Sequence, residues 1–321
     1  MESVIGNSAD DQLFFTLIQS AQNEDGGWGF HRGGQSRVEP TCWALHALAS
    51  PQANQKFIER GLKYLGAAQL ADGSWPATTE EKTGCWVTSL ATRVFLEFGG
   101  KDYLHMAVAG LRWVCEDWPR DSSWWQRWMR KLARAKKFSE QNDALRGWGW
   151  TPGTSSWVEP TAFALLALEA CPAELLPGTA KKRRELGEAL IYDRMCPGGG
   201  WNCGNPRVYG VAGEPLVLPT AWALLALRRN PLRSENLLSL DWLAREVGKI
   251  QAPGSLALAQ ICLQASGRAW PTDAPSFREL HARNESLQNV QVAAWICMAL
   301  RPETRWQIAG ENAKSAPGKL S

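Results

Sequence analysis

The sequence has no uninterrupted apolar run of about eighteen residues, the length at which a helix becomes a candidate for crossing a bilayer. It also begins without a basic region followed by an apolar stretch, so we expect no signal peptide. Neither sign of charge is in large excess, and a formal net charge of +3 is too small to indicate a nucleic-acid partner. We therefore predict a cytoplasmic protein that neither spans a membrane nor binds nucleic acid.

Closely spaced cysteine pairs are also missing. The eight cysteines are scattered and include no CxxC pair, which argues against a disulfide framework. Most lie in apolar runs, where a free cysteine behaves as a small buried hydrophobe. Cys42 and His46 are four residues apart on one predicted helix and would supply half a zinc site, but no third ligand is apparent. We predict no metal and no other cofactor.

What the sequence does have is tryptophan, with eighteen residues, and an internal repeat that uses several of them. A GxW element or a variant of it occurs at residues 26–28, 73–75, 147–150, 199–201 and 254–256. Three apolar phrases share a Pro-Thr pair: VEPTCWALHAL (38–48), VEPTAFALLAL (158–168) and LPTAWALLAL (218–227). Proline is favoured at the first helical position, so Pro40, Pro160 and Pro219 predict three helix starts.

The repeat predicts pairs of helices, each with an outer amphipathic helix and an inner apolar one. Outer helices are expected near 11–22, 53–69, 101–116, 180–195, 234–250 and 273–284. Inner helices are expected near 40–49, 86–98, 160–170, 219–229, 255–265 and 290–300. Such units cannot bury their apolar faces alone and must pack against neighbours. Six of them can close a ring, but the pattern also allows an open solenoid.

The stretch RGLKYLGAAQLADGSW (60–75) resembles the QW repeat of squalene and oxidosqualene cyclases, and QSAQNEDGGW (19–28) is a partial copy. The resemblance covers residues 10–300 and implies an all-α (α/α)6 toroid of the terpenoid cyclase and protein prenyltransferase superfamily. We expect one toroid domain over 1–305, with an inserted basic amphipathic segment at 118–145 and a polar tail at 306–321.

The resemblance also implies where chemistry would occur. Cyclases similar to squalene-hopene cyclase protonate an alkene with the central acid of a D-x-D-D-T motif. Laid against that motif, RVEPT (37–41) and WVEPT (157–161) place Glu39 and Glu159 at the central acid, although both flanking acids are replaced. The reaction needs a strong acid in a dry cavity and aromatic faces that stabilise cationic charge. A purely structural role is open too, because a carboxylate at a helix start interacts favourably with the helix dipole.

Aromatic side chains supply the candidate substrate-binding residues. Trp43, Phe163 and Trp222 occupy the same position in three inner helices. If that position faces the centre of the ring, they line a site for an isoprenoid, and if it faces the outer helices, they are core. We add Trp157 and His46 to this candidate set.

The inserted segment contains SSWWQRWMRKLARAKKFSEQ (122–141), in which aromatic and basic residues fall on opposite sides of a helix. A tryptophan-rich face opposite a basic face is typical of a helix that lies in a membrane surface. We therefore predict peripheral membrane contact through 122–138, although a helix packed on the toroid or a substrate lid would explain the pattern as well. The contact residues would be Trp124, Trp125, Trp128, Arg127, Arg130 and Lys131.

The leading hypothesis is a toroid that binds an isoprenoid or another lipid in a central apolar cavity and cyclises it without metal, starting by protonation. A non-catalytic lipid-binding or scaffold toroid is the alternative. A prenyltransferase β-subunit-like protein comes third, because Pro40-Thr41-Cys42 stands where that family has its zinc-binding Asp-x-Cys.

Overall fold

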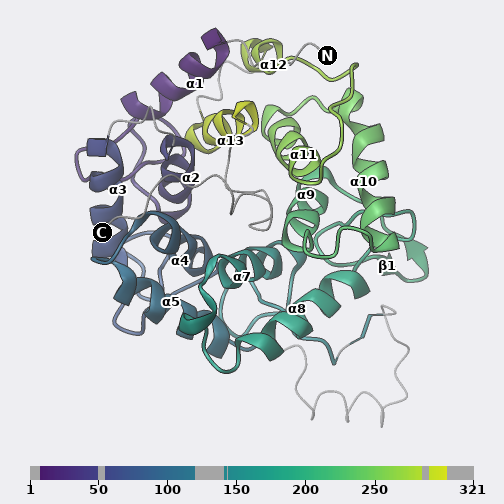
Figure 1. The fold of residues 1–321 in the computed structure, drawn as a ribbon, viewed down its shortest axis with the longest axis horizontal. Coiled ribbons are helices and arrows are strands. Elements are labelled where there is room, and N and C mark those ends of the chain that lie inside the picture. The colour runs from purple at the N-terminus through teal and green to yellow at the C-terminus, as the bar shows by residue number, and fades with distance from the viewer. Residues whose placement is uncertain (1–7, 50–54, 120–140, 143, 284–288, 302–321) are drawn as a thin grey trace.

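The computed structural model describes residues 8–49, 55–119, 141–142, 144–283 and 289–301 (Figure 1). Its inner helices are α2 (Val38–Leu48), α4 (Val87–Phe98), α7 (Val158–Ala170), α9 (Val217–Ala226), α11 (Pro253–Ala265) and α13 (Val290–Leu300). Its outer helices are α1 (Ser8–Ser20), α3 (Gln55–Ala68), α5 (Leu104–Glu116), α8 (Ala180–Asp193), α10 (Ser234–Glu246) and α12 (Phe277–Arg283). Two short 3-10 helices, η1 (Ala173–Leu175) and η2 (Val247–Lys249), and an antiparallel hairpin, β1 (Arg207–Val208) with β2 (Val211–Ala212), complete the described elements.

The inner helices form a closed ring, and the predicted (α/α)6 toroid is confirmed. Contacts run from α2 through α4, α7, α9 and α11 to α13, and α13 packs in turn on α2. Figure 1 shows the outer helices as a second ring around the first. Among the outer helices, the main partner of each inner helix is the one that follows it in the chain, and the outer partner of α13 is α1. The N-terminal helix therefore fills the place of a helix after α13, and the open solenoid is excluded.

The tryptophans of the repeat make the same two hydrogen bonds in four units. Each indole Nε1 donates to an outer-helix carbonyl at 2.6–2.7 Å: Trp28 to Ile18, Trp75 to Leu65, Trp148 to Val114 and Trp201 to Ile191. Each backbone N–H donates to a threonine hydroxyl of an inner helix at 2.8–3.0 Å, the acceptors being Thr41, Thr88, Thr161 and Thr220. The Pro-Thr phrase thus repeats because its threonine ties the tryptophan loop to the inner helix.

Backbone hydrogen bonds also join neighbouring units where inner helices begin. The N–H groups of Val38, Trp86 and Val158 donate to carbonyls of Ala77, Trp150 and Cys203, at 3.2–3.3 Å. The N–H of Val290 donates to the carbonyl of Phe30 at 2.8 Å and joins the last unit to the first. These bonds hold the starts of the inner helices on one face of the ring.

The predicted helix starts are corrected by two residues. Helices α2, α7 and α9 begin at Val38, Val158 and Val217, so each proline stands third in its helix rather than first. Proline is tolerated there for the same reason, since N–H groups in the first turn have no acceptor within the helix. Glu39 and Glu159 are consequently the second residues of their helices, within the first turn.

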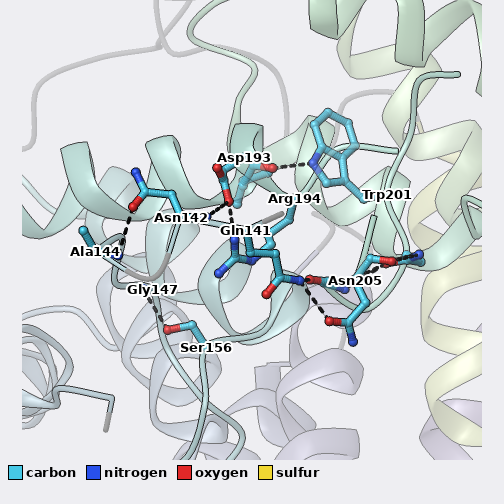
Figure 2. Close-up of polar contacts among 12 residues, drawn as sticks. Gln141, Asn142, Ala144, Gly147, Ser156, Asp193, Arg194, Trp201 and Asn205 are labelled. Carbon is cyan, nitrogen blue, oxygen red and sulfur yellow. Dashed lines mark hydrogen bonds and ion pairs between the residues drawn. The ribbon is translucent and has the colours of Figure 1, made fainter. Parts of the chain in front are cut away.

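Residues 141 and 142, near the end of the inserted segment, are fastened to two other parts of the protein (Figure 2). Gln141 Nε2 donates to Asn205 Oδ1 at 2.9 Å, and the backbone N–H of Asn142 donates to Asp193 Oδ2 at 3.0 Å. Nearer the ring, Arg183 is fully buried and donates to the carbonyls of Asp117 and Gly147. One guanidinium thereby connects the two ends of the chain between which the segment is inserted.

Candidate functional site

The two candidate acids lie on the face of the ring at which the inner helices begin, here named the acid face. Glu39 is on α2 and Glu159 is on α7, and α4 packs between these helices. Both side chains are half-buried. They are near enough that the charge of Glu159 contributes to raising the pKa of Glu39.

Glu39 has a defined polar partner. Gln291 Nε2, on α13, donates to Glu39 Oε1 at 2.9 Å. Burial raises the pKa of Glu39 from 4.5 to about 7, because the charged form loses hydration, while Gln291 and Trp43 act in the opposite direction. Near neutral pH, Glu39 therefore carries its proton in a large fraction of molecules.

Glu159 occupies a different environment despite its identical sequence context. Within the described part of the chain, its carboxylate makes no hydrogen bond or ion pair. Burial alone raises its pKa. The two glutamates are thus distinguished by Gln291, which reaches only Glu39.

One helical turn deeper, four aromatic side chains meet at the ring axis and form what we call the aromatic layer: Trp43, Phe163, Trp222 and Trp295. Trp43 stacks on Trp222 with ring centroids 5.1 Å apart. Their helices, α2 and α9, stand opposite each other in the ring, so these side chains can touch only across the axis. The shared position of Trp43, Phe163 and Trp222 therefore faces the centre rather than the outer helices.

Three residues of this region were missed from the sequence. Trp86 stands where α4 begins, half-buried, and stacks on Phe163 with centroids 5.2 Å apart. Gln291 and Trp295 are four residues apart on α13, as Glu39 and Trp43 are on α2. That shared spacing was a usable signal, but α13 lacks the Pro-Thr pair that marks α2, α7 and α9.

A charged cluster lies beyond the aromatic layer, toward the ends of the inner helices: His46, Arg93, Glu97, Glu169 and Arg228. Arg93 Nε donates to Glu97 Oε1 at 2.6 Å, and His46 Nδ1 lies 3.5 Å from Glu97 Oε2. His46 follows Glu39 by seven residues on α2, with Trp43 between them. The structure therefore places His46 on the far side of the aromatic layer from the glutamates.

The other predicted site residues are not part of this constellation. Trp157 precedes α7 in extended conformation, and its backbone pairs with Trp148. The predicted membrane-contact residues Trp124, Trp125, Trp128, Arg127, Arg130 and Lys131 lie outside the described residues, so this contact stays a prediction. Among the helices that the structure describes, none is both long and apolar enough to cross a membrane.

Comparison with known proteins gives one informative sequence relative. No family model matches the chain. Drimenyl diphosphate synthase from Streptomyces showdoensis is 26% identical over an alignment of 246 residues, gaps included, and the match covers 64% of this chain and 44% of that protein. The chain thus spans less than half the length of the curated relative that it matches.

Solved structures with a similar fold come from several kinds of protein. An alpha-amylase from Clostridium perfringens superposes with a TM-score of 0.59 at 10% identity, covering 93% of this chain and 99% of that one. A protein from Actinoplanes superposes with a TM-score of 0.56 at 15% identity, covering 92% of this chain and 98% of that one. An α-1,6-mannanase from Salegentibacter superposes with a TM-score of 0.55 at 11% identity, covering 93% of this chain and 99% of that one. At such identities only the fold is shown. The toroid is therefore shared with diverse proteins, whereas the sequence similarity confirms the resemblance to terpenoid cyclases.

Proposed function

We propose that the protein is a metal-independent terpenoid cyclase in which Glu39 protonates the terminal alkene of a linear isoprenoid bound at the acid face. The observation that carries the proposal is the environment of Glu39, where burial raises the pKa of the carboxyl to about 7 and aromatic side chains lie one helical turn away. A carboxyl group whose pKa lies near the working pH is suited to general acid catalysis. The similarity to drimenyl diphosphate synthase favours prenyl diphosphates as the first substrates to test.

In the proposed reaction, the O–H bond of the Glu39 carboxyl breaks and a C–H bond forms at the terminal alkene, which leaves a tertiary carbocation. Attack by the next alkene closes a ring and moves the positive charge along the chain. Loss of a proton to water from a neighbouring carbon then gives a neutral cyclic alkene, and solvent returns a proton to Glu39. The diphosphate takes no part in these bond changes.

Gln291 has a specific role in this proposal. When Glu39 gives up its proton, the hydrogen bond from Gln291 Nε2 becomes a bond to an anion, which is stronger than a bond to a neutral group. An interaction that strengthens as charge develops lowers the barrier rather than only binding the substrate. Trp86 and the aromatic layer would stabilise the carbocation through their ring faces.

A lipid-binding toroid without catalysis is the second candidate, and a sequence observation favours it. Arg37 and Pro40 replace the acids that flank the central acid in the D-x-D-D-T motif. Without them, the acidity of Glu39 depends on its surroundings alone. The two candidates differ in whether a bound isoprenoid is converted.

The test is product analysis after incubation of the purified protein with C15 and C20 prenyl diphosphates and with squalene, with and without detergent. Glu39→Gln and Glu159→Gln are compared with Glu24→Gln, a matched change at an exposed glutamate. We expect a cyclic product with the unaltered protein and Glu24→Gln, and none with Glu39→Gln. Unchanged substrate in every sample, with lipid recovered on the protein, would instead establish the binding toroid.

A further inference from the structure

The aromatic layer brings side chains from opposite sides of the ring into contact at its axis. Phe163 lies 5.0 Å from Trp222 and 6.1 Å from Trp43, between ring centroids, and Trp295 lies 5.8 Å from Trp43 and 6.0 Å from Trp222. Together with the stacked pair Trp43–Trp222, these contacts join side chains from α2, α7, α9 and α13. All four side chains are more than nine-tenths buried.

The layer also lies close beneath the acid. Glu39 and Trp43 are four residues apart on α2, which corresponds to about 6 Å along the helix axis. This depth is comparable to the length of a single isoprene unit. A linear isoprenoid that enters from the acid face therefore has room for only its terminal unit between the level of Glu39 and the layer.

The charged cluster gives a second, independent reason why an isoprenoid would not continue along the axis. Arg93 is 3% exposed and is paired with Glu97, and the buried guanidinium of Arg228 is paired with Glu169. Bringing an apolar chain against such ion pairs removes polar neighbours or water without replacing their hydrogen bonds. An apolar ligand thus gains nothing from passing the layer.

We infer that the aromatic layer is a stop that lets only the terminal isoprene unit reach the acid, so that Trp222 selects which alkene is protonated. This inference rests on the proposed function and names its specificity-determining residue. Internal alkenes would come level with Glu39 only if the chain slid one unit deeper, into the space that the Trp222 side chain fills. Trp222 is the informative member, since it touches the other three rings and stands on α9, opposite the helix that carries Glu39.

The chemical consequence of opening the stop is defined. With the Trp222 side chain truncated, the O–H bond of Glu39 would break and a C–H bond would form at an internal alkene, and the carbocation formed there would lose a proton to water from a neighbouring carbon. The terminal alkene would then remain in the product. Its two vinylic methyl groups distinguish this isomer, by NMR, from a product of terminal protonation with the same mass.

The experiment compares Trp222→Ala with Trp222→Phe, which keeps an aromatic ring at the axis, and with Trp222→Leu as a milder truncation in case the alanine variant does not fold. We expect at least a tenfold larger fraction of products with an intact terminal alkene from Trp222→Ala or Trp222→Leu with C15 and C20 diphosphates. Trp222→Phe should match the unaltered protein. If a folded truncation variant forms only the product of terminal protonation, the inference is overturned.

A binding measurement separates this inference from the proposed function. Affinities for C10 and C15 prenyl alcohols are measured by titration calorimetry, with no turnover required. Each unit that enters an apolar site adds affinity in proportion to the surface it buries. We expect the preference for C15 over C10 to rise about tenfold in Trp222→Ala. If the preference for C15 rises but no product forms, the inference that the aromatic layer is a stop is kept and the proposed cyclase activity is rejected. If the preference is unchanged, the inference that the layer is a stop is rejected.

Discussion

The raised pKa of Glu39 predicts that this side chain makes the stability of the protein depend on pH. Burial raises the pKa of Glu39 from 4.5 to about 7 in the folded protein. The folded state therefore binds more protons than the unfolded chain between these two pH values, so the free energy of unfolding must fall as pH rises through this window. A shift from 4.5 to about 7 corresponds to about 3 kcal/mol, which is lost as pH rises from the lower value through the higher one.

Glu39→Gln isolates this contribution. The amide keeps the size of the carboxyl group and an oxygen that accepts from Gln291, but it has no proton to lose. We expect the free energy of unfolding of Glu39→Gln to exceed that of the unaltered protein by about 3 kcal/mol more at pH 7.5 than at pH 4.5. Other titrating groups cancel in this difference.

The assay is equilibrium unfolding in urea at a series of pH values for the unaltered protein, Glu39→Gln and Glu24→Gln. The exposed Glu24 serves as the matched control and should leave the pH dependence unchanged. Parallel curves for Glu39→Gln and the unaltered protein would refute the reasoning, because they would mean that Glu39 ionises alike in both states. The same curves would also remove the basis for a protonated donor near neutral pH.

Two further predictions concern the ring itself. Trp75→Phe removes the indole N–H that donates to the buried Leu65 carbonyl, and the free energy of unfolding measured by urea denaturation should fall by about 1–3 kcal/mol. The exposed Trp118 offers a matched Trp→Phe control with a smaller expected effect. Asn289→Ala removes the cap that accepts from two N–H groups at the start of α13, and about 1 kcal/mol should be lost. Faster amide hydrogen exchange confined to the start of α13 would locate that loss, and unchanged exchange there would contradict it.

The helices were predictable because their signals are local. The GxW element, the Pro-Thr pair and the apolar runs each lie within one unit, and each predicted helix is present within a few residues of its expected place. Closure was not predictable, because it depends on pairs such as Val290 and Phe30 that are far apart in the sequence. No local pattern states which distant backbone groups will meet.

The direction in which Trp43, Phe163 and Trp222 point could not be predicted from the sequence, for a different reason. The inner helices are buried on almost all sides, so apolar residues surround the helix and periodicity no longer marks one face. The charged cluster was hidden in the same way. Arg93 stands in an apolar helix, and its partner Glu97 follows at the spacing of a surface ion pair, although both are largely buried.

Ring closure is also what makes two glutamates with the same sequence context unequal. On α2, closure brings α13 alongside, and Gln291 reaches Glu39 from there. The helix that stands before α7 in the ring, as α13 stands before α2, is α4, and within the described residues no side chain of α4 donates to Glu159. Titratable pairs whose surroundings differ in this way take different roles in acid–base chemistry. Glu39 has a donor that stabilises the anion left after proton transfer, and Glu159 has none, so the proposed acid is Glu39. Gln291→Leu, which removes this donor and leaves both glutamates in place, should therefore lower the turnover rate. If Gln291→Leu turns over substrate as fast as the unaltered protein, the hydrogen bond from Gln291 does not assign the role.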